Sequence, residues 1–316
     1  MVRQDVVLSD TDSTMFSIDE WVNWYFGDLR FSQEAYAIAG AVMFMSTQCI
    51  AHCLAILSCN MGVADEHLFT LSMKPEYVFP VFVQSPVAKH YFTAKLVEEG
   101  KVFKDIVMEI KGVHNKNSAL PATIIGPAQE LMEQIIRDIM AGKKISNNAN
   151  IKEVADLERK IIASLRSSSV EFLKRSNIKE ASAYGRNALE SNFAHHTLWQ
   201  EVFAPTYGSI DPPPYDVIKV PTTLTSPSIY KAWLDGMKNQ KLAERMRGWS
   251  ERHNKKQMPT FYFHLDKILS SAIPEEVIEV IDYRKIVLDL TNVRRMLLDS
   301  LGFPVRSEFL LTELGY

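Results

Sequence analysis

Asp10 and Asp12 lie two residues apart, in a short polar segment between the apolar runs at residues 6–8 and 15–18. Two apolar runs separated in this way predict a β-hairpin that carries both carboxylates at its tip. Side chains two positions apart can project from the same side of a β-ribbon. Mg²⁺ is held by one or two carboxylates together with substrate phosphates, so the pair suggests metal-assisted phosphoryl transfer. The alternative is a solvated acidic turn, in which each Asp bonds to its own backbone.

The segments that follow predict a mixed α/β region and then a mainly helical one. Short β-rich runs at residues 77–79, 90–93 and 106–110 are separated by Pro and Gly and predict strands. Apolar residues recur at helical spacing in four later segments, at residues 129–141, 152–175, 228–256 and 275–301. We therefore expect an α+β fold with antiparallel hairpins first, helices second and a boundary near Gly112.

A long apolar stretch at residues 35–57 predicts a helix that begins after a Ser32 cap. Ser46, Thr47, Gln48 and His52 interrupt its second half, whereas a membrane span needs about 20 predominantly apolar residues. We expect a long helix buried under a sheet. No basic stretch followed by an apolar core marks a secretory signal at the start of the sequence.

Three cysteines, Cys49, Cys53 and Cys59, form no even framework and predict reduced thiols in a cytosolic protein. The spacing Cys49-x-x-His52-Cys53 could suit a metal ion, but it lies within the apolar stretch. Small residues at helical spacing there favour core packing.

Composition places the chain among ordinary globular proteins, with 316 residues in one or two domains, 47% hydrophobic and 23% charged. The net charge of −3 excludes a globally basic nucleic-acid binder, so a basic surface must be local. Residues 137–186 hold eleven Lys and Arg against six Asp and Glu, and residues 238–256 hold seven against two. Such clusters suit phosphate backbones, with a solvated helical face as the alternative.

Several short motifs follow one another along the chain in a fixed order. Asp-Thr-Asp-Ser at residues 10–13 comes first, Lys-His-Tyr at residues 89–91 precedes a predicted hairpin, and Lys-Gly at residues 111–112 precedes Asn-Ser-Ala-Leu-Pro at residues 117–121. Segments 192–196 and 276–303 complete the series. In this order they resemble the carboxylate motif, the Lys-x-Tyr and Lys-Gly elements and the thumb segments of family B DNA polymerases, especially T4-like phage replicative enzymes. The resemblance covers essentially the whole chain.

The resemblance implies a DNA-directed DNA polymerase that uses dNTPs, primer–template DNA and two Mg²⁺ ions. Asp12 would be the direct metal ligand, and Asp10 would lie further from the ion. Glu76 falls where related phage enzymes carry another palm carboxylate, although an exposed strand-end Glu is an equal alternative. Two ions about 3.5–4 Å apart activate the nucleophile and steady the leaving group in such chemistry.

The same resemblance places other residues at DNA. Lys89 would reach the minor groove near the primer terminus, where acceptors occur in every base pair, and Tyr91 would brace the primer backbone. Lys111 would contact duplex phosphates, with Ser13, Gly112 and Ser118 also at DNA. A solvated strand lysine is the alternative for Lys89 and for Lys111.

By this resemblance, residues 1–112 form the C-terminal part of the palm and residues 113–316 form the thumb. Exonuclease, fingers and the first palm strand with its metal-binding Asp would come from an N-terminal partner chain, as in a split viral enzyme, or the sequence is a fragment. The sequence departs from the family where Leu8-Ser9 replaces Tyr-Gly and His90 replaces a frequent Arg. A non-catalytic DNA-binding subunit is the first alternative function, and an unrelated metal-dependent hydrolase is the second.

The C-terminal tail carries apolar side chains after Pro304. Replicative polymerases of this resemblance often end in a peptide that docks into a sliding clamp. The anchors would fill a pocket on the clamp, since a few buried apolar residues carry most interface energy. A tail packed on its own thumb is equally compatible. The candidate anchors are Phe309, Leu311, Leu314 and Tyr316.

Overall fold

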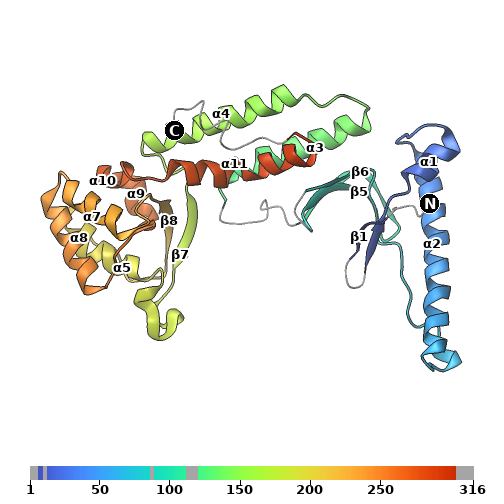
Figure 1. Cartoon of the computed structure of the whole chain (residues 1–316), viewed down its shortest axis with the longest axis horizontal. Coiled ribbons are helices and arrows are strands. Elements are labelled where there is room, and N and C mark those ends of the chain that lie inside the picture. The colour runs from blue at the N-terminus through green and yellow to red at the C-terminus, as the bar shows by residue number, and fades with distance from the viewer. Residues whose placement is uncertain (1–5, 10–12, 86–88, 112–119, 304–316) are drawn as a thin grey trace. The chain divides into compact units, whose positions relative to one another are not determined.

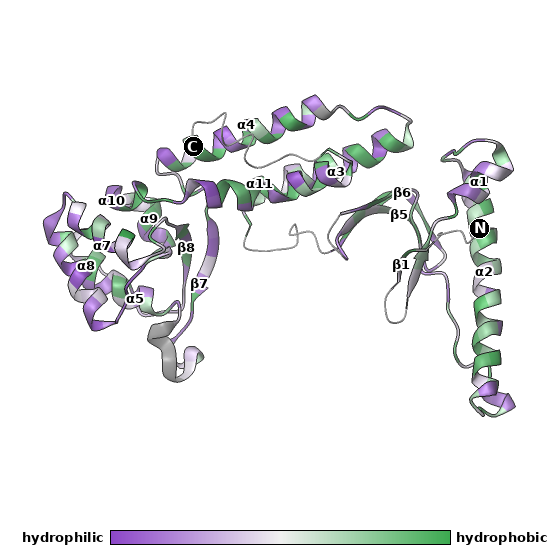
Figure 2. Cartoon of the chain, viewed as in Figure 1, coloured by the Kyte–Doolittle hydropathy of each residue, from purple (hydrophilic) through white to green (hydrophobic). Residues whose placement is uncertain are grey.

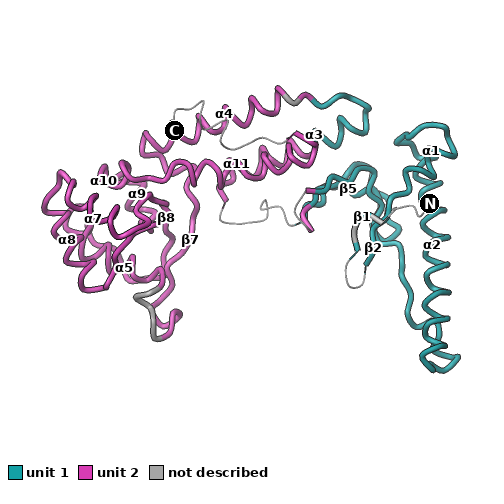
Figure 3. The backbone as a smooth tube through the Cα atoms, viewed as in Figure 1, with its two compact units in different colours: residues 1–84, 91–111, 133–145 teal, residues 85–90, 112–132, 146–316 magenta. Residues whose placement is uncertain are grey.

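The computed structural model describes residues 6–9, 13–85, 89–111 and 120–303. The chain divides into two compact units (Figure 3). Unit 1 consists of residues 1–84, 91–111 and 133–145, and unit 2 consists of residues 85–90, 112–132 and 146–316. Helices and antiparallel sheets occur together along the chain, which confirms the predicted α+β class (Figure 1).

Unit 1 begins with a two-stranded hairpin, as predicted. Strand β1 (Val6–Ser9) pairs antiparallel with β2 (Thr14–Phe16). The pairs run from Val6 opposite Phe16 to Ser9 opposite Thr14, with an irregularity between Val6 and Leu8. The paired strands therefore stand on either side of residues 10–13 in the sequence.

Two helices follow the hairpin, α1 (Asp19–Phe26) and the long α2 (Gln33–Asn60). The Ser32 hydroxyl caps α2 by accepting a hydrogen bond from the Ala35 backbone N–H at 3.2 Å, as the sequence predicted. Helix α2 is long and apolar enough to cross a membrane by length and composition alone. Figure 2 shows hydrophobic colouring along most of it.

The prediction that α2 is buried is wrong for this chain. Only small residues of α2 are buried, and large apolar side chains such as Phe44, Met45 and Ile56 are exposed. Cys49 and Cys53, predicted to pack in a core, are free and exposed as well. Composition identified an apolar helix, but it does not reveal whether the covering surface belongs to the same chain.

A four-stranded antiparallel sheet completes unit 1. Strand β5 (Tyr91–Glu98) pairs with β3 (Tyr77–Val78), with β4 (Phe82–Gln84) and with β6 (Lys101–Lys111). The tight β5–β6 turn uses positive φ at Glu99 and Gly100, which two-residue hairpin turns favour. The hairpin predicted after Lys89-His90-Tyr91 is thus present.

Unit 2 contains two long helices that pack against each other, α4 (Asn147–Arg166) and α11 (Tyr283–Ser300). A buried ion pair between Glu158 and Arg295 joins them, and Arg295 Nε donates to Thr291 Oγ1 at 2.9 Å. Helix α3 (Ala122–Met140) passes from unit 2 into unit 1 along the chain. Ile124 near its start belongs to the core of unit 2.

A three-stranded antiparallel sheet forms the centre of unit 2, in the order β7 (Lys174–Ile178), β8 (Tyr215–Pro221) and β9 (Thr260–His264). The helix predicted over residues 152–175 ends at Arg166, because Lys174 and Arg175 pair with β8. This sheet was missed in the sequence because its strands are widely separated along the chain.

Short helices surround this sheet (Figure 1). They are α5 (Ala194–Leu198), α6 (Ala204–Tyr207), α7 (Pro227–Gly236), α8 (Gln240–Arg252), α9 (Leu265–Ser271) and α10 (Glu275–Ile278). The predicted helical segment 228–256 is therefore two helices, and the segment 275–301 is interrupted before Tyr283. Trp199, Trp249, Phe261 and Phe263 are almost fully buried in the resulting core.

Candidate functional site

The paired carboxylates belong to the connection between β1 and β2. Ser9 and Thr14 are the register pair nearest to this connection, and their hydroxyl oxygens are 3.3 Å apart. Ser13 is exposed. Asp10 and Asp12 lie outside the described residues, so the hairpin strands are confirmed and the role of the two carboxylates stays a prediction.

The sheet of unit 1 brings together two residues that the sequence placed at DNA. Tyr91, at the start of β5, stands opposite Lys111 at the end of β6. Glu109 stands two residues before Lys111 and so faces the same side of the sheet. Its carboxylate lies 3.6 Å from the Lys111 ammonium, while the Lys111 side chain is 57% exposed. Lys111 can therefore reach a phosphate while Glu109 restrains its position.

A buried lysine connects this pair to further carboxylates. The Lys95 ammonium lies 2.9 Å from Glu98 Oε1 and 3.5 Å from Glu109 Oε2, with only 12% of its side chain exposed. The hydrogen bond to Glu98 and the two negative charges raise the pKa of Lys95. The Lys95 ammonium also lies 5.3 Å from the centre of the Tyr77 ring. Lys95 stays charged and fixes both carboxylates against the sheet.

Glu76 lies close to the same group of side chains. Its backbone oxygen accepts a hydrogen bond from the Glu99 N–H at 2.7 Å. A hydrogen bond with the Glu76 side chain raises the pKa of Tyr77. Burial raises the pKa of Tyr91, and the charges of Glu109 and Glu76 add to that effect. The carboxylates of Glu76 and Glu109 thus lie near the Tyr91 hydroxyl, which stays protonated.

Within the described part of the chain, no group of three or more His, Cys, Asp or Glu side chains could hold a metal ion. Glu76 is exposed, and its proposed metal contact stays a prediction. Lys89 is exposed and has a left-handed backbone with φ of 60°, which is unusual for a residue other than glycine. The remaining predicted residues lie outside the described ones, namely Gly112, Ser118, Phe309, Leu311, Leu314 and Tyr316.

Sequence reasoning missed Lys95, Glu98 and Glu109. A signal was present, because charged residues alternate with apolar ones at Glu109 and Lys111, as expected for one face of a strand. The partner of each charge, however, depends on the β5–β6 register, which the sequence alone did not define.

Comparison with known families identifies one family that matches the chain. The family described as Divergent Family B DNA polymerase matches residues 1–308, nearly the entire chain. The chain therefore belongs to the divergent family B DNA polymerases. No curated protein matches the sequence. Family membership gives the chain a function related to DNA polymerisation, with DNA as the substrate that it contacts.

Proposed function

We propose that this chain is the C-terminal palm-and-thumb subunit of a split viral family B DNA polymerase, acting in the host cytoplasm. The observation that carries the proposal is the pairing of β1 with β2 on either side of Asp10-Thr11-Asp12-Ser13. A hairpin at this motif, followed by the β5–β6 sheet and then by helices, follows the palm-then-thumb order that the sequence resemblance implies.

In this proposal Asp12 and Asp10 hold the metal ions that family B polymerases use. Carboxylate oxygens suit Mg²⁺, and a pair of them two residues apart needs further ligands from substrate phosphates and from another carboxylate. When bound, the two ions would stabilise the attacking and leaving oxygens of nucleotidyl transfer. Glu76 is the candidate for an additional acidic group near the site, on the segment before β3.

The β5–β6 sheet would hold the primer strand. Lys111 contacts backbone phosphates, and Glu109 with Lys95 keeps it directed away from the sheet. The protonated Tyr91 hydroxyl can donate a hydrogen bond to the primer backbone, since its raised pKa keeps it neutral. Lys89 would reach the minor groove just before β5. These contacts recognise backbone and shape, so binding should depend little on DNA sequence.

An N-terminal partner chain would carry the exonuclease, the fingers and the first palm strand with another metal-binding Asp. The support for it is the apolar surface formed by side chains of residues 21–71. Large apolar side chains exposed together on neighbouring segments are typical of a protein interface. Its exposed large side chains are Trp21, Trp24, Tyr25, Leu29, Phe44, Met45, Ile56, Leu57, Met61, Val63, Phe69 and Leu71.

The test is primer extension by the chain reconstituted with the polymerase chain of the same genome that carries the exonuclease and fingers motifs. Asp12→Asn should abolish extension, and Asp10→Asn should reduce it, while both bind primer–template as the parent does. Asp19→Asn, on the exposed first turn of α1, is the matched control and should extend primers normally.

Parent-like extension by Asp12→Asn would refute the catalytic assignment. A reconstituted parent complex that binds primer–template DNA but shows no extension would instead favour the alternative function, a non-catalytic DNA-binding subunit.

A further inference from the structure

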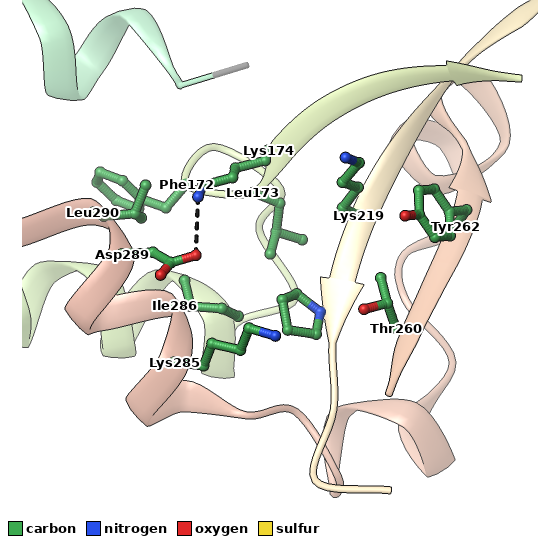
Figure 4. A pocket seen from close by; sticks show the side chains of 11 residues that line it. Phe172, Leu173, Lys174, Lys219, Thr260, Tyr262, Lys285, Ile286, Asp289 and Leu290 are labelled. Atoms are coloured by element: carbon green, nitrogen blue, oxygen red, sulfur yellow. Dashed lines mark hydrogen bonds and ion pairs between the residues drawn. The ribbon is translucent and has the colours of Figure 1, made fainter. Parts of the chain in front are cut away.

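A cavity of about 230 Å³ opens on unit 2 where the β7–β8–β9 sheet meets the first turns of α11 (Figure 4). Nothing in the polymerase proposal assigns it a ligand. Its walls combine cationic and apolar side chains. The lining residues that carry charge are Lys174, Lys219, Lys285 and Asp289.

The charged groups of the cavity come from three separate elements. Lys174 of β7 stands opposite Lys219 of β8, which stands opposite Tyr262 of β9, so all three face the same side of the sheet. Lys285 reaches the cavity from α11, and Asp289 one turn later pairs with Lys174 at 2.9 Å. Three ammonium groups therefore face a single carboxylate.

Two of these ammonium groups have no carboxylate partner among the described residues. Neither Lys219 nor Lys285 lies within ion-pair distance of a carboxylate in the described part of the chain, and the Lys219 ammonium lies 5.6 Å from the centre of the Tyr262 ring. Like charges gathered in a concave site repel one another and raise the local positive potential. The cavity is therefore suited to an anion.

The rest of the lining is mostly apolar, with Thr260 and the Tyr262 hydroxyl as its polar groups. Phe172, Leu173, Ile286 and Leu290 are each at most 4% exposed and form a rigid floor. The Tyr262 ring is held by His195, with ring centres 4.6 Å apart, so it is fixed at the edge of the cavity. A ligand that fills the site must carry an anionic group and a compact uncharged part.

We propose that this cavity binds one nucleotide unit of an unpaired nucleic-acid strand. Lys219 and Lys285 contact the phosphate, and the pentose packs against Ile286 and the Tyr262 ring. The cavity is smaller than the roughly 300–1,000 Å³ typical of sites for drug-sized ligands, so it takes the phosphate and pentose and leaves the base outside.

A duplex is a poor fit to this cavity. Base pairing and stacking hold each pentose in a fixed position along the double helix, so a duplex can offer phosphates only to the rim lysines. An unpaired strand can rotate a single nucleotide into a concave site. The inference goes beyond the proposed grip on duplex DNA, because it assigns unit 2 a second, single-strand contact.

The test measures binding of a fluorescent 12-residue oligothymidylate to the full chain by anisotropy across a salt titration. The Lys219→Ala/Lys285→Ala double variant should weaken binding on the order of tenfold at low salt. It should also reduce the slope of log K against log salt by about 0.7, since both lysines contact the same phosphate and one lost phosphate contact on a single strand contributes about that much. Lys231→Ala, on the exposed face of α7, is the matched control for loss of one lysine charge and should change binding little.

A second variant should change the affinity for the oligothymidylate in the opposite direction. Asp289→Asn removes the one carboxylate found among the described residues that line the cavity and releases Lys174, so it should tighten binding of the oligothymidylate about two- to threefold. Both sets of variants alter partly exposed side chains, and thermal melting identifies any variant whose fold has changed. Weaker binding by a folded Asp289→Asn variant would overturn the electrostatic assignment.

Three further probes separate the sources of phosphate. A 12-base-pair duplex should lose much less affinity than the single strand in the double variant, and thymidine 5′-monophosphate and inorganic phosphate should compete only weakly. Equal losses for duplex and single strand would overturn the single-strand assignment. Lysine-dependent binding of the monophosphate without binding of the oligothymidylate would make the site a free-nucleotide site. Parent-like binding by the double variant would overturn the proposal, and none of these outcomes depends on primer extension.

Discussion

The two units differ most in what covers their apolar side chains. In unit 1, Trp24 is 78% exposed, Met61 is 76% exposed and Phe44 is 61% exposed. In unit 2, Trp199, Trp249 and Phe261 are at most 2% exposed. Among the described residues, Ile229 and Leu269 are the only exposed large apolar side chains in unit 2. All the others belong to unit 1.

This contrast shows that unit 2 buries its large aromatic side chains in a core of its own, whereas unit 1 leaves many large apolar side chains exposed. The aromatic core of unit 2 joins its sheet to the surrounding helices. Helix α2 in unit 1 carries Glu34 as its only charged residue and exposes its large apolar side chains to water. Burial of that surface on association would be favourable by the same hydrophobic effect that stabilises unit 2.

The largest expected effect is on the stability of unit 2. Phe261→Ala should lower its free energy of unfolding by about 3–5 kcal/mol, because the ring is fully buried and its removal leaves a cavity. The matched change Phe44→Ala in unit 1 should alter the unfolding of the isolated chain by no more than about 0.5 kcal/mol. Urea denaturation of both variants measures this. Similar losses would show that the two units do not differ as described.

The second effect is a pH dependence confined to unit 2. Burial, and to a lesser degree the charge of Lys255, lowers the pKa of His195 to about 3, and its Nδ1 is buried without a partner in the described structure. Below the unfolded value of 6.5 the unfolded chain binds a proton that the folded chain does not. The stability from neutral His195 is therefore present above pH 6.5 and decreases as the pH falls toward 3, by at most about 1.4 kcal/mol per pH unit.

His195→Gln should remove that part of the slope, which denaturation between pH 4 and 8 would measure. His67→Gln, on an exposed residue of unit 1, is the matched control for the loss of a histidine. An unchanged slope in His195→Gln would contradict the stated burial of this ring.

A smaller effect concerns DNA binding by unit 1. Lys111→Ala should weaken primer–template binding for all DNA sequences alike and reduce the salt slope by about 0.9, as expected for one lost duplex phosphate contact. Lys89→Ala should also weaken primer–template binding to a similar extent for all DNA sequences. Lys104→Ala, on an exposed position of β6, is the control. If Lys111→Ala has the same affinity and salt slope as the control, Lys111 is a solvated strand lysine that does not contact DNA.

The smallest expected effect comes from the tail. Deletion of residues 309–316 should shorten the products made with a sliding clamp and leave clamp-free synthesis by the reconstituted enzyme unchanged. Product lengths with and without clamp measure this. If the deletion lowers thermal stability and both kinds of synthesis equally, the tail packs on its own thumb.

Local patterns were sufficient to predict the hairpin around residues 10–13, the Ser32 cap and the hairpin of β5 and β6. Each depends on neighbouring residues, through turn chemistry, capping or alternation. The sheet of unit 2 depends on pairing between distant segments, so the helix predicted over residues 152–175 wrongly included the first two residues of β7. The cavity lysines were missed for the same reason, since Lys174, Lys219 and Lys285 come together only through that pairing.

Helix α2 shows a different limit. Its length and apolar character were predicted correctly, but its burial was not, because its large apolar side chains are exposed in the described structure. Hydrophobic pattern predicts that a face will be covered, but the pattern does not say by which molecule.

Primer extension during titration with the partner chain tests the central claim most directly. The chain alone should extend no primer, because a two-metal site needs a further carboxylate that we assign to the partner. Activity should rise with added partner and saturate at one partner per chain. Phe44→Asp should require more partner to reach half of the maximal activity, because it places a charge on the exposed face of α2. Primer extension by the chain alone, at a rate that added partner does not change, would contradict the account.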